Sequence, residues 1–229
     1  LGTALSCGYA GVLPAVERLK IHKRQGVLLG ADTEIQLYHP VKSEAERLFA
    51  LCFSEVSRLE KIFSLYDKNS AISELNREGR ISEAPKELLE LVETSIHLSK
   101  LTEGAFDITV QPLWEFYNKF FTQNPNSLDG PSLEQIEQVL ARVGYNKLYI
   151  SNKEITLGME GMGITLNGIA QGYITDRVTQ ILAENGLSNL LVNMGEYRSL
   201  GKHQDGTSWR MGLADPERPW DYNRIVNLE

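Results

Sequence analysis

The stretch from Gly161 to Arg177, GMGITLNGIAQGYITDR, constrains the fold of this chain more than any other. Its apolar run at 164–166 predicts a short strand, and apolar residues at helical spacing predict a helix over 169–185. Asn167 and Gly168 then lie near the helix N-terminus, where unpaired N–H groups and the helix dipole favour an anion. Such a turn can hold a phosphate, or it can be a plain joint whose glycines serve packing. The stretch by itself favours the plain joint.

The composition is that of an ordinary globular protein, and it excludes some partners. The 229 residues suffice for one large domain or two small ones, with a sizeable core. The net charge is −7, the sequence pI is about 5.3, and the longest basic run is His22–Arg24. Such a chain is a poor ligand for a phosphate backbone, so we expect no nucleic-acid partner. No apolar run approaches the roughly 20 residues of a membrane span, so we expect no transmembrane segment in the mature domain.

Cysteine and histidine offer little for a metal site. Cys7 and Cys52 are the two cysteines, and Cys52 lies on the apolar face of a predicted helix, where we expect a buried thiol. The histidines show no H-x-x-x-H or similar pairing, so we predict neither a cysteine site nor a histidine zinc site. The four histidines are His22, His39, His97 and His203.

The N-terminus has the composition of an export signal. Residues 1–15 are small, apolar and uncharged, and Cys7 ends a loose likeness to a lipoprotein cleavage box. We interpret residues 1–25 as a leader remnant followed by a polar connector at 17–25, and residues 26–229 as the folded domain. The alternative is a helical or mobile N-terminal extension. The leader interpretation predicts a periplasmic or otherwise extracytoplasmic protein, with a lipid anchor as one option.

The first half of the chain predicts mainly helices, and the second half mainly strands. This order is typical of an α+β fold with mixed or antiparallel sheets flanked by helices. Periodicity and capping residues predict helices at 43–63, 70–76, 85–104, 113–121, 132–144 and 169–185. The predicted strands are 27–38, 148–150, 154–157, 164–166 and 189–193, together with a hairpin of 196–201 and 209–213.

Five stretches, in this order and spacing, resemble the motifs of the FAD:protein FMN transferase family, also called ApbE. The likeness covers roughly Val27 to Pro216, and the series is far more specific than any single motif. The stretches are Ser64–Tyr66 with Ser70–Asn76 (S-x-Y and S-x-x-S-x-L-N), Thr102–Val110 (G-A-F-D-x-T-V), Gly161–Arg177 (D-L-G-G-I-A-K-G-Y), Val192–Glu196 (N-x-G-G-[DE]) and Gly206–Pro216.

The resemblance implies an activity as well as a fold. Members of the family bind FAD as a substrate and cleave its pyrophosphate with the help of Mg²⁺. They join FMN through a phosphoester to a threonine of an acceptor flavoprotein of a redox or electron-transfer system, and AMP leaves. In phosphoryl transfer of this kind, positioning and charge neutralisation supply most of the rate. We therefore expect residues 26–229 to form an ApbE-like flavin transferase domain that is incomplete at its C-terminus.

The same resemblance implies a set of site residues, although it assigns no catalytic residue. Tyr66 can pack its aromatic face on a ring of FAD, or it can be an ordinary core tyrosine. Asp107 can contact the flavin, or it can cap the helix that follows. Gly168 stands where a backbone carbonyl of the family binds Mg²⁺. The implied FAD contacts are Leu29, Tyr66, Ala105, Phe106, Asp107, Thr165 and Gln171.

This sequence departs from the family pattern at the site of the diphosphate. Thr165 stands where the family usually has Asp, and Gln171 where it usually has Lys, so both positions lose a charge. The family's further metal ligands lie in an A-D-x-x-A-T-like stretch, which does not occur before Glu229. Two other functions therefore stay open beside the transferase: a non-catalytic flavin-binding or redox-protein maturation factor, and a purely structural interaction domain.

Overall fold

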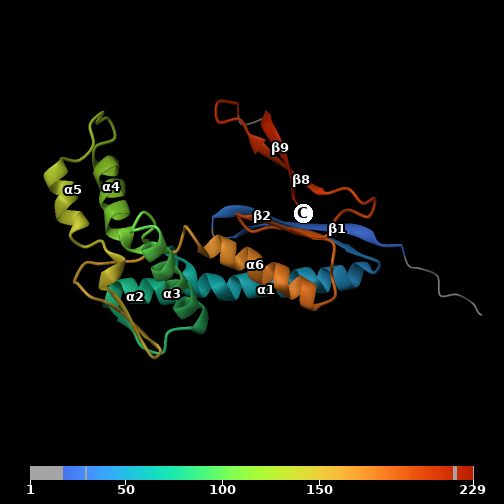
Figure 1. Cartoon of the computed structure of the whole chain (residues 1–229), viewed down its shortest axis with the longest axis horizontal. Coiled ribbons are helices and arrows are strands. Elements are labelled where there is room, and N and C mark those ends of the chain that lie inside the picture. Colours follow the sequence, from blue (N-terminus) through green and yellow to red (C-terminus); the bar gives the residue numbers. More distant parts are fainter. Residues whose placement is uncertain (1–17, 29, 219–220, 229) are drawn as a thin grey trace, which may run out of the picture.

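The structure is a computed structural model, and it describes residues 18–28, 30–218 and 221–228. The predicted leader at 1–15 and the predicted FAD contact Leu29 lie outside the described residues. Within the described ranges, no helix combines the length and the apolar character that crossing a membrane requires. The chain forms two lobes, and an arm rises from each of them (Figure 1).

One lobe is a four-stranded antiparallel sheet with two helices on one face (Figure 1). The strand order is β1-β2-β6-β7, and the helices α1 (Lys42–Phe63) and α6 (Ala170–Glu184) pack against each other beneath the sheet. Strand β2 directs Ile35 and Leu37 into the core, where both are fully buried. The strands are β1 (Lys20–Leu28), β2 (Ala31–His39), β6 (Leu190–Asn193) and β7 (Tyr197–Leu200).

The other lobe holds further helices and a small antiparallel sheet in the order β3-β5-β4. Two of its helices, α2 and α5, begin at capping residues: Ser70 accepts a hydrogen bond from the N–H of Ser73, and Ser132 forms a capping box with Gln135. Helices α4 and α5 project from this lobe as its arm (Figure 1). The elements are α2 (Ala71–Glu78), β3 (Arg80–Ile81), α3 (Lys86–Leu101), the short 3-10 helix η1 (Ile108–Val110), α4 (Gln111–Gln123), α5 (Leu133–Leu140), the short 3-10 helix η2 (Tyr145–Lys147), β4 (Leu148–Ser151) and β5 (Glu154–Leu157).

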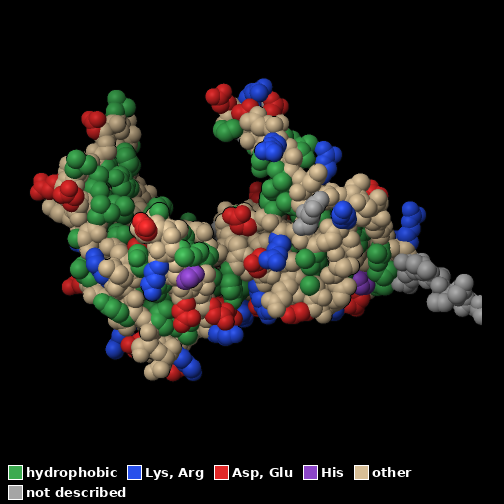
Figure 2. Space-filling model, viewed as in Figure 1, with side chains coloured by type: hydrophobic (Ala, Val, Ile, Leu, Met, Phe, Trp, Pro, Cys, Tyr) green, Lys and Arg blue, Asp and Glu red, His purple; other side chains and the backbone are tan. Residues whose placement is uncertain are grey.

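The second arm is the hairpin of β8 (Trp209–Ala214) and β9 (Tyr222–Leu228), which rises from the sheet lobe (Figure 1). Buried Trp209 anchors its base, because its ring centroid lies 3.9 Å from that of His203 and 6.1 Å from that of Tyr38. The Tyr38 hydroxyl lies 2.9 Å from Nδ1 of His203. The space-filling view shows a broad hollow between the two arms (Figure 2).

The predicted α+β class is confirmed, and each predicted helix has a counterpart close to its expected place. Cys52 is fully buried, as its position on the apolar face of α1 predicts. Two helices end earlier than expected. The helix predicted over 85–104 ends at Leu101, and the helix predicted over 132–144 ends at Leu140.

Three strand predictions are wrong, and so is the polar connector. The strand predicted over 27–38 is divided between β1 and β2, which pair with each other. The predicted polar connector at 17–25 contributes most of β1, whose polar residues suit an exposed edge strand. Residues 164–166 are not part of a strand, because their backbone bonds a side chain instead, as described below. The expected hairpin does not form either: β7 pairs with β6, and β8 pairs with β9.

Candidate functional site

The N-terminal end of α6 is an exposed turn with unpaired backbone donors. Ile169 occupies the N-cap position, and the carbonyl of Leu166 accepts hydrogen bonds from the N–H groups of Ile169 and Ala170. In the part of the chain that the structure describes, no oxygen accepts from the N–H of Gln171 or Gly172. These two groups are the orphan donors of the first helical turn, so they and the helix dipole favour a negative group here.

A side-chain amide holds the segment that leads into this turn. Asn76, the last residue of the first motif, donates from Nδ2 to the carbonyl of Ile164 at 2.8 Å and accepts at Oδ1 from its N–H at 2.7 Å. The N–H of Thr165 donates to the carbonyl of Ile108 at 2.8 Å. Residues 164–166 are thus fixed from both sides without being part of a sheet.

A small cavity of about 160 Å³ joins the first motif to the start of α6. Tyr66 lines it with Asn167 and Gln171. Its side chain is 81% exposed, so the alternative of a core tyrosine is wrong. An exposed aromatic ring beside the orphan donors of α6 is suited to packing on a flat ligand ring. The FAD contact itself stays a prediction.

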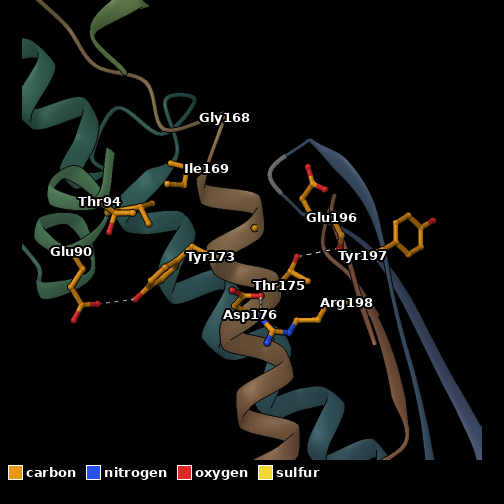
Figure 3. A pocket seen from close by; sticks show the side chains of 12 residues that line it. Glu90, Thr94, Gly168, Ile169, Tyr173, Thr175, Asp176, Glu196, Tyr197 and Arg198 are labelled. Carbon is orange, nitrogen blue, oxygen red and sulfur yellow. Dashed lines mark hydrogen bonds and ion pairs between the residues drawn. The ribbon is translucent and has the colours of Figure 1, made fainter. Parts of the chain in front are cut away.

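A larger cavity of about 860 Å³ lies on another side of the same helix end, between α3, α6 and β7 (Figure 3). It extends from Gly168 to the start of β7. On its α3 side the hydroxyl of Tyr173 donates to Glu90 at 3.3 Å, and on its β7 side Arg198 pairs with Asp176 (Figure 3). Burial and the neighbouring carboxylates, Glu90 foremost, raise the pKa of Tyr173 to about 12, so this hydroxyl remains a donor at neutral pH.

The side chain of Gln171 lies against the backbone of Gly195, in the fourth motif (Val192–Glu196). A Cβ atom at Gly195 would meet the Gln171 side chain at 2.6 Å, and Gly195 has a φ of +95°, which strains any residue but glycine. Oδ1 of Asn193 accepts from the N–H of Gly195 at 3.0 Å and tightens the turn. Gly195 therefore brings the predicted FAD contact Gln171 against the beginning of β7.

Asp107 acts as a structural cap in this fold. Its Oδ1 accepts from the N–H and hydroxyl of Thr109 at 2.8 and 2.7 Å, and its Oδ2 accepts from the N–H of Tyr145 at 2.8 Å. The cap that we weighed as the alternative is thus present, while a contact with flavin stays a prediction. The adjacent Phe106 lies over Gly168, with 3.5 Å between its ring and the Cβ position there, and Ala105 is exposed.

The described residues contain no acidic cluster of the kind that could hold Mg²⁺. Among the described residues, no group of three or more His, Cys, Asp or Glu side chains could hold a metal ion. Thr165 is engaged locally, because its hydroxyl accepts from the N–H of Asn167 at 3.3 Å. Gly168, exposed at the turn, is the one predicted ligand that the structure places at the site. We therefore derive no chemical step through a metal.

Two features of the site were not predicted. Asn76 lies inside a quoted motif, so its presence could be noticed, but its bond to Ile164 spans 88 residues. A cluster of four charged residues fastens α1, α3 and α6 below the cavities. It consists of Glu55, Arg58, Glu87 and Arg177, joined by three ion pairs. Only the contact between Glu55 and Arg58 is local, so a helical charge pattern could have indicated that pair alone.

The chain is similar to known proteins over most of its length. The ApbE family profile matches residues 29–229, which is most of the chain. This chain belongs to the ApbE family. Among its ApbE relatives, the FAD:protein FMN transferase of Escherichia coli K12 is 28% identical over 164 residues, covering 69% of this chain and 46% of that protein. The Vibrio cholerae (classical Ogawa 395) protein of the same name is 30% identical over 172 residues, covering 71% and 50%.

Solved ApbE structures have the same fold. The apo flavinyl transferase ApbE of Pseudomonas stutzeri matches with a TM-score of 0.77 and 26% identity, over 92% of this chain and 67% of that one. The ApbE protein of Thermotoga maritima matches with a TM-score of 0.77 and 27% identity, over 91% and 68%. The chain spans about half the length of the curated ApbE relatives that it matches.

Proposed function

We propose that this ApbE chain binds FAD at the N-terminal end of α6 and transfers its FMN part to a hydroxyl group of another protein. One observation carries the proposal: four motif segments that are distant in sequence meet at this helix end. Tyr66 shares a cavity with Gln171, Phe106 contacts Gly168, and the turn at Gly195 contacts Gln171. The names of the relatives, FAD:protein FMN transferase, support the same reaction.

The proposed chemistry is a phosphoryl transfer. The acceptor oxygen forms a bond to the phosphorus of the FMN part, and the bond from that phosphorus to the bridging oxygen breaks. AMP leaves with the bridging oxygen and the electron pair of that bond, and the hydroxyl proton passes to water. The N–H groups of Gln171 and Gly172, at the positive end of the helix dipole, are suited to the diphosphate. The exposed ring of Tyr66 is suited to packing on a ring of FAD.

Several finer points of the proposal rest on the family resemblance. They are a threonine as the acceptor, Mg²⁺ as the ion that neutralises the diphosphate, and an acceptor flavoprotein of a redox system. The proposed extracytoplasmic place of action rests instead on the leader-like composition of residues 1–15. The described residues supply no acidic cluster for the ion. We therefore expect Mg²⁺ to bind this chain weakly, and we assign no residue as a catalytic acid or base.

A second candidate function is a flavin-binding or maturation factor without catalysis. The observation that favours it is the loss of charge at the helix end, where Thr165 and Gln171 are neutral. A neutral amide can donate a hydrogen bond to a phosphate, but it cannot neutralise the charge that develops as AMP leaves. Such a protein binds FAD through Tyr66 and the orphan N–H groups and releases little AMP.

Incubation of the chain with FAD, Mg²⁺ and an acceptor flavoprotein distinguishes the two functions. Covalent flavin on the acceptor with an equal amount of AMP supports the transferase. FAD binding without AMP supports the factor, and absence of FAD binding contradicts both. Thr165→Asp combined with Gln171→Lys should raise AMP release if the missing charge limits the reaction. Gln180→Lys adds the same positive charge as Gln171→Lys at an exposed position farther along α6, so it is the control for that half of the double variant.

The ligand preference gives a separate test of the site. FMN transfer from FAD requires the adenylate half as the leaving group, so we expect FAD to bind more tightly than FMN. A fluorescence titration measures both dissociation constants. Equal or tighter binding of FMN would argue against a transferase site.

A further inference from the structure

Helix α2 carries a row of three polar side chains. Ser70 at its N-cap, Ser73 and Asn76 follow one another at a spacing of three residues, which brings them to one side of the helix. Ile72 and Leu75, on another side, are fully buried in the core. The polar row therefore belongs to a helix that cannot shift without disturbing the packing of the core.

The first two residues of the row hold the segment that carries Tyr66. The hydroxyls of Ser70 and Ser73 donate to the carbonyl of Ser64 at 2.6 and 3.3 Å. The hydroxyl of Ser64 in turn accepts from the N–H of Tyr66 at 3.2 Å. Ser70 is fully buried, so its bond to Ser64 is shielded from water. One end of α2 thus determines where the backbone of Tyr66 lies.

The last residue of the row holds the segment that leads into α6. Asn76 bonds both backbone groups of Ile164, because a side-chain amide can donate and accept at the same time. Ile164 is fully buried, and the turn at Asn167 and Gly168 follows it closely. From Ser70 to Asn76 the helix axis advances about 9 Å. The segments before Tyr66 and before α6 are therefore attached to the two ends of one short helix.

We propose that α2 is a rigid spacer that sets the separation between the ring of Tyr66 and the orphan N–H groups at the start of α6. Its positioning residues are Ser70, Ser73 and Asn76, which act through backbone segments instead of contacting FAD. The inference rests on the proposed function, in which FAD packs a ring on Tyr66 and places its diphosphate at the helix end. Both contacts form together only if their separation matches the ligand, and a separation fixed in advance lowers the entropy cost of binding. The polar residues of the S-x-x-S-x-L-N motif then share one role.

A double-mutant cycle tests whether α2 couples the two contacts. Asn76→Ala removes both bonds to Ile164 and should weaken FAD binding about tenfold, as measured by fluorescence titration of the folded protein. Tyr66→Ala should cost less FAD affinity in the Asn76→Ala background than in the unaltered chain, because the spacer no longer holds the ring in register with the diphosphate site. Asn118→Ala, at an exposed position of α4, is the matched control and should leave FAD affinity unchanged. Effects of Asn76→Ala and Tyr66→Ala that simply multiply would overturn the spacer.

The pH dependence of Asn76→Asp separates positioning from a general loss of stability. The ionised carboxylate accepts from the N–H of Ile164 but cannot donate to its carbonyl, whereas the protonated carboxyl does both. The adjacent carbonyl oxygen disfavours the charged form and so raises the pKa of the new carboxyl. FAD affinity relative to the unaltered chain should therefore recover as the pH falls from about 8 to about 5. Asn118→Asp adds the same charge and should show no recovery, and a constant ratio for Asn76→Asp would overturn Asn76 as a positioning residue.

The outcomes distinguish the spacer from the proposed function. FAD binding with independent effects of Asn76→Ala and Tyr66→Ala overturns the spacer and leaves the function standing. If the unaltered chain binds no FAD, the function fails and amide hydrogen exchange decides on the spacer. Exchange is then compared with that of residues 190–200, which corrects for a general loss of stability. Faster exchange in Asn76→Ala at both 64–70 and 164–172 supports the spacer, and a change confined to 164–172, or no change, overturns it.

Discussion

The two ends of α6 have different tasks, although they belong to one continuous helix. At its C-terminal end, Val178 and Leu182 are fully buried, and the Asn185 side chain closes the last turn by donating to the carbonyl of Ile181. At its N-terminal end, the N–H groups of Gln171 and Gly172 have no acceptor in the described chain, and cavities open on different sides. The buried end stabilises the fold, while the open end leaves backbone groups free for a ligand. Substitutions along α6 and its neighbours should therefore separate stability from binding.

The largest effect on stability is expected at the buried end. Leu182→Ala removes a fully buried side chain and should lower the free energy of unfolding by about 3 kcal/mol, because a cavity remains. Urea unfolding measures the loss. Leu101→Ala, at a side chain that is 67% exposed, is the control and should have little effect. FAD affinity of the folded Leu182→Ala protein should not change, and a loss of affinity would contradict the division between the two ends.

The next effect is expected in the charged cluster beneath the middle of α6. The hydrogen bond from Arg58, opposed by burial and aided by Arg177, lowers the pKa of Glu55 from 4.5 to about 2. A lowered pKa adds stability above the unfolded pKa of about 4.5, and that stability is lost as the pH falls toward 2. Glu55→Gln should therefore lower the unfolding free energy at pH 7 by about 2 kcal/mol.

The pH dependence identifies the cause of that loss. Between pH 4.5 and 2 the unaltered protein should lose more stability than Glu55→Gln, and chemical unfolding at several pH values measures both. Glu44→Gln removes an exposed partner of Arg47 on the same helix and is the control, for which we expect little change. Parallel pH curves for Glu55→Gln and the unaltered chain would refute this role of the cluster.

A smaller effect on stability is expected at Asp107, which caps η1 beside the proposed FAD site. Asp107→Ala removes the acceptor for the Thr109 and Tyr145 bonds and should cost about 1 kcal/mol of stability, as the loss of a helix cap does. Because Asp107 also fixes the turn that places Phe106 over Gly168, FAD affinity should fall as well. Asp129→Ala, in an exposed loop, controls for the loss of a carboxylate. Unchanged FAD affinity, measured by titration, would leave Asp107 with a structural role only.

The smallest effect on stability, combined with a clear effect on binding, is expected at the open end. Tyr66→Ala should change the unfolding free energy by less than about 0.5 kcal/mol, because the side chain is 81% exposed. FAD affinity should fall about fivefold, which corresponds to about 1 kcal/mol of lost aromatic packing. Tyr222→Ala, at an exposed tyrosine of β9, is the control. Equal FAD affinity of the two variants would place the flavin elsewhere.

The local sequence pattern predicted the helices well, because the buried residues of a helix and its capping residue lie within a few positions of one another. The local pattern did not predict which strands pair with each other. Lys20–Leu28 lacks the apolar alternation of a strand, yet it pairs with β2 along its whole length, since an edge strand can be polar. Trp209–Ala214 alternates correctly, but alternation says nothing of which strand it joins. Its true partner is Tyr222–Leu228.

The sequence predicted which residues gather at the candidate site better than it predicted what each of them does there. The family motifs brought Tyr66 and Gln171 into one list, and the structure places both in one cavity. Sequence could not tell that Tyr66 is exposed, because a single aromatic residue after a helix is compatible with either environment. The cap at Asp107 depends on Tyr145, 38 residues away, and such a contact leaves no local signal.

The pairing of Asn76 with Ile164 has a consequence for the order in which the protein matures. The two partners are 88 residues apart, so a chain emerging from the ribosome has α1 and α2 long before it has the partner of Asn76. Contacts of such sequence separation form late in folding, because loop closure precedes them. The nascent chain should therefore acquire helices first and FAD affinity only after residues 164–172 have left the exit tunnel. Stalled chains of increasing length, titrated with FAD, would show this as a single step.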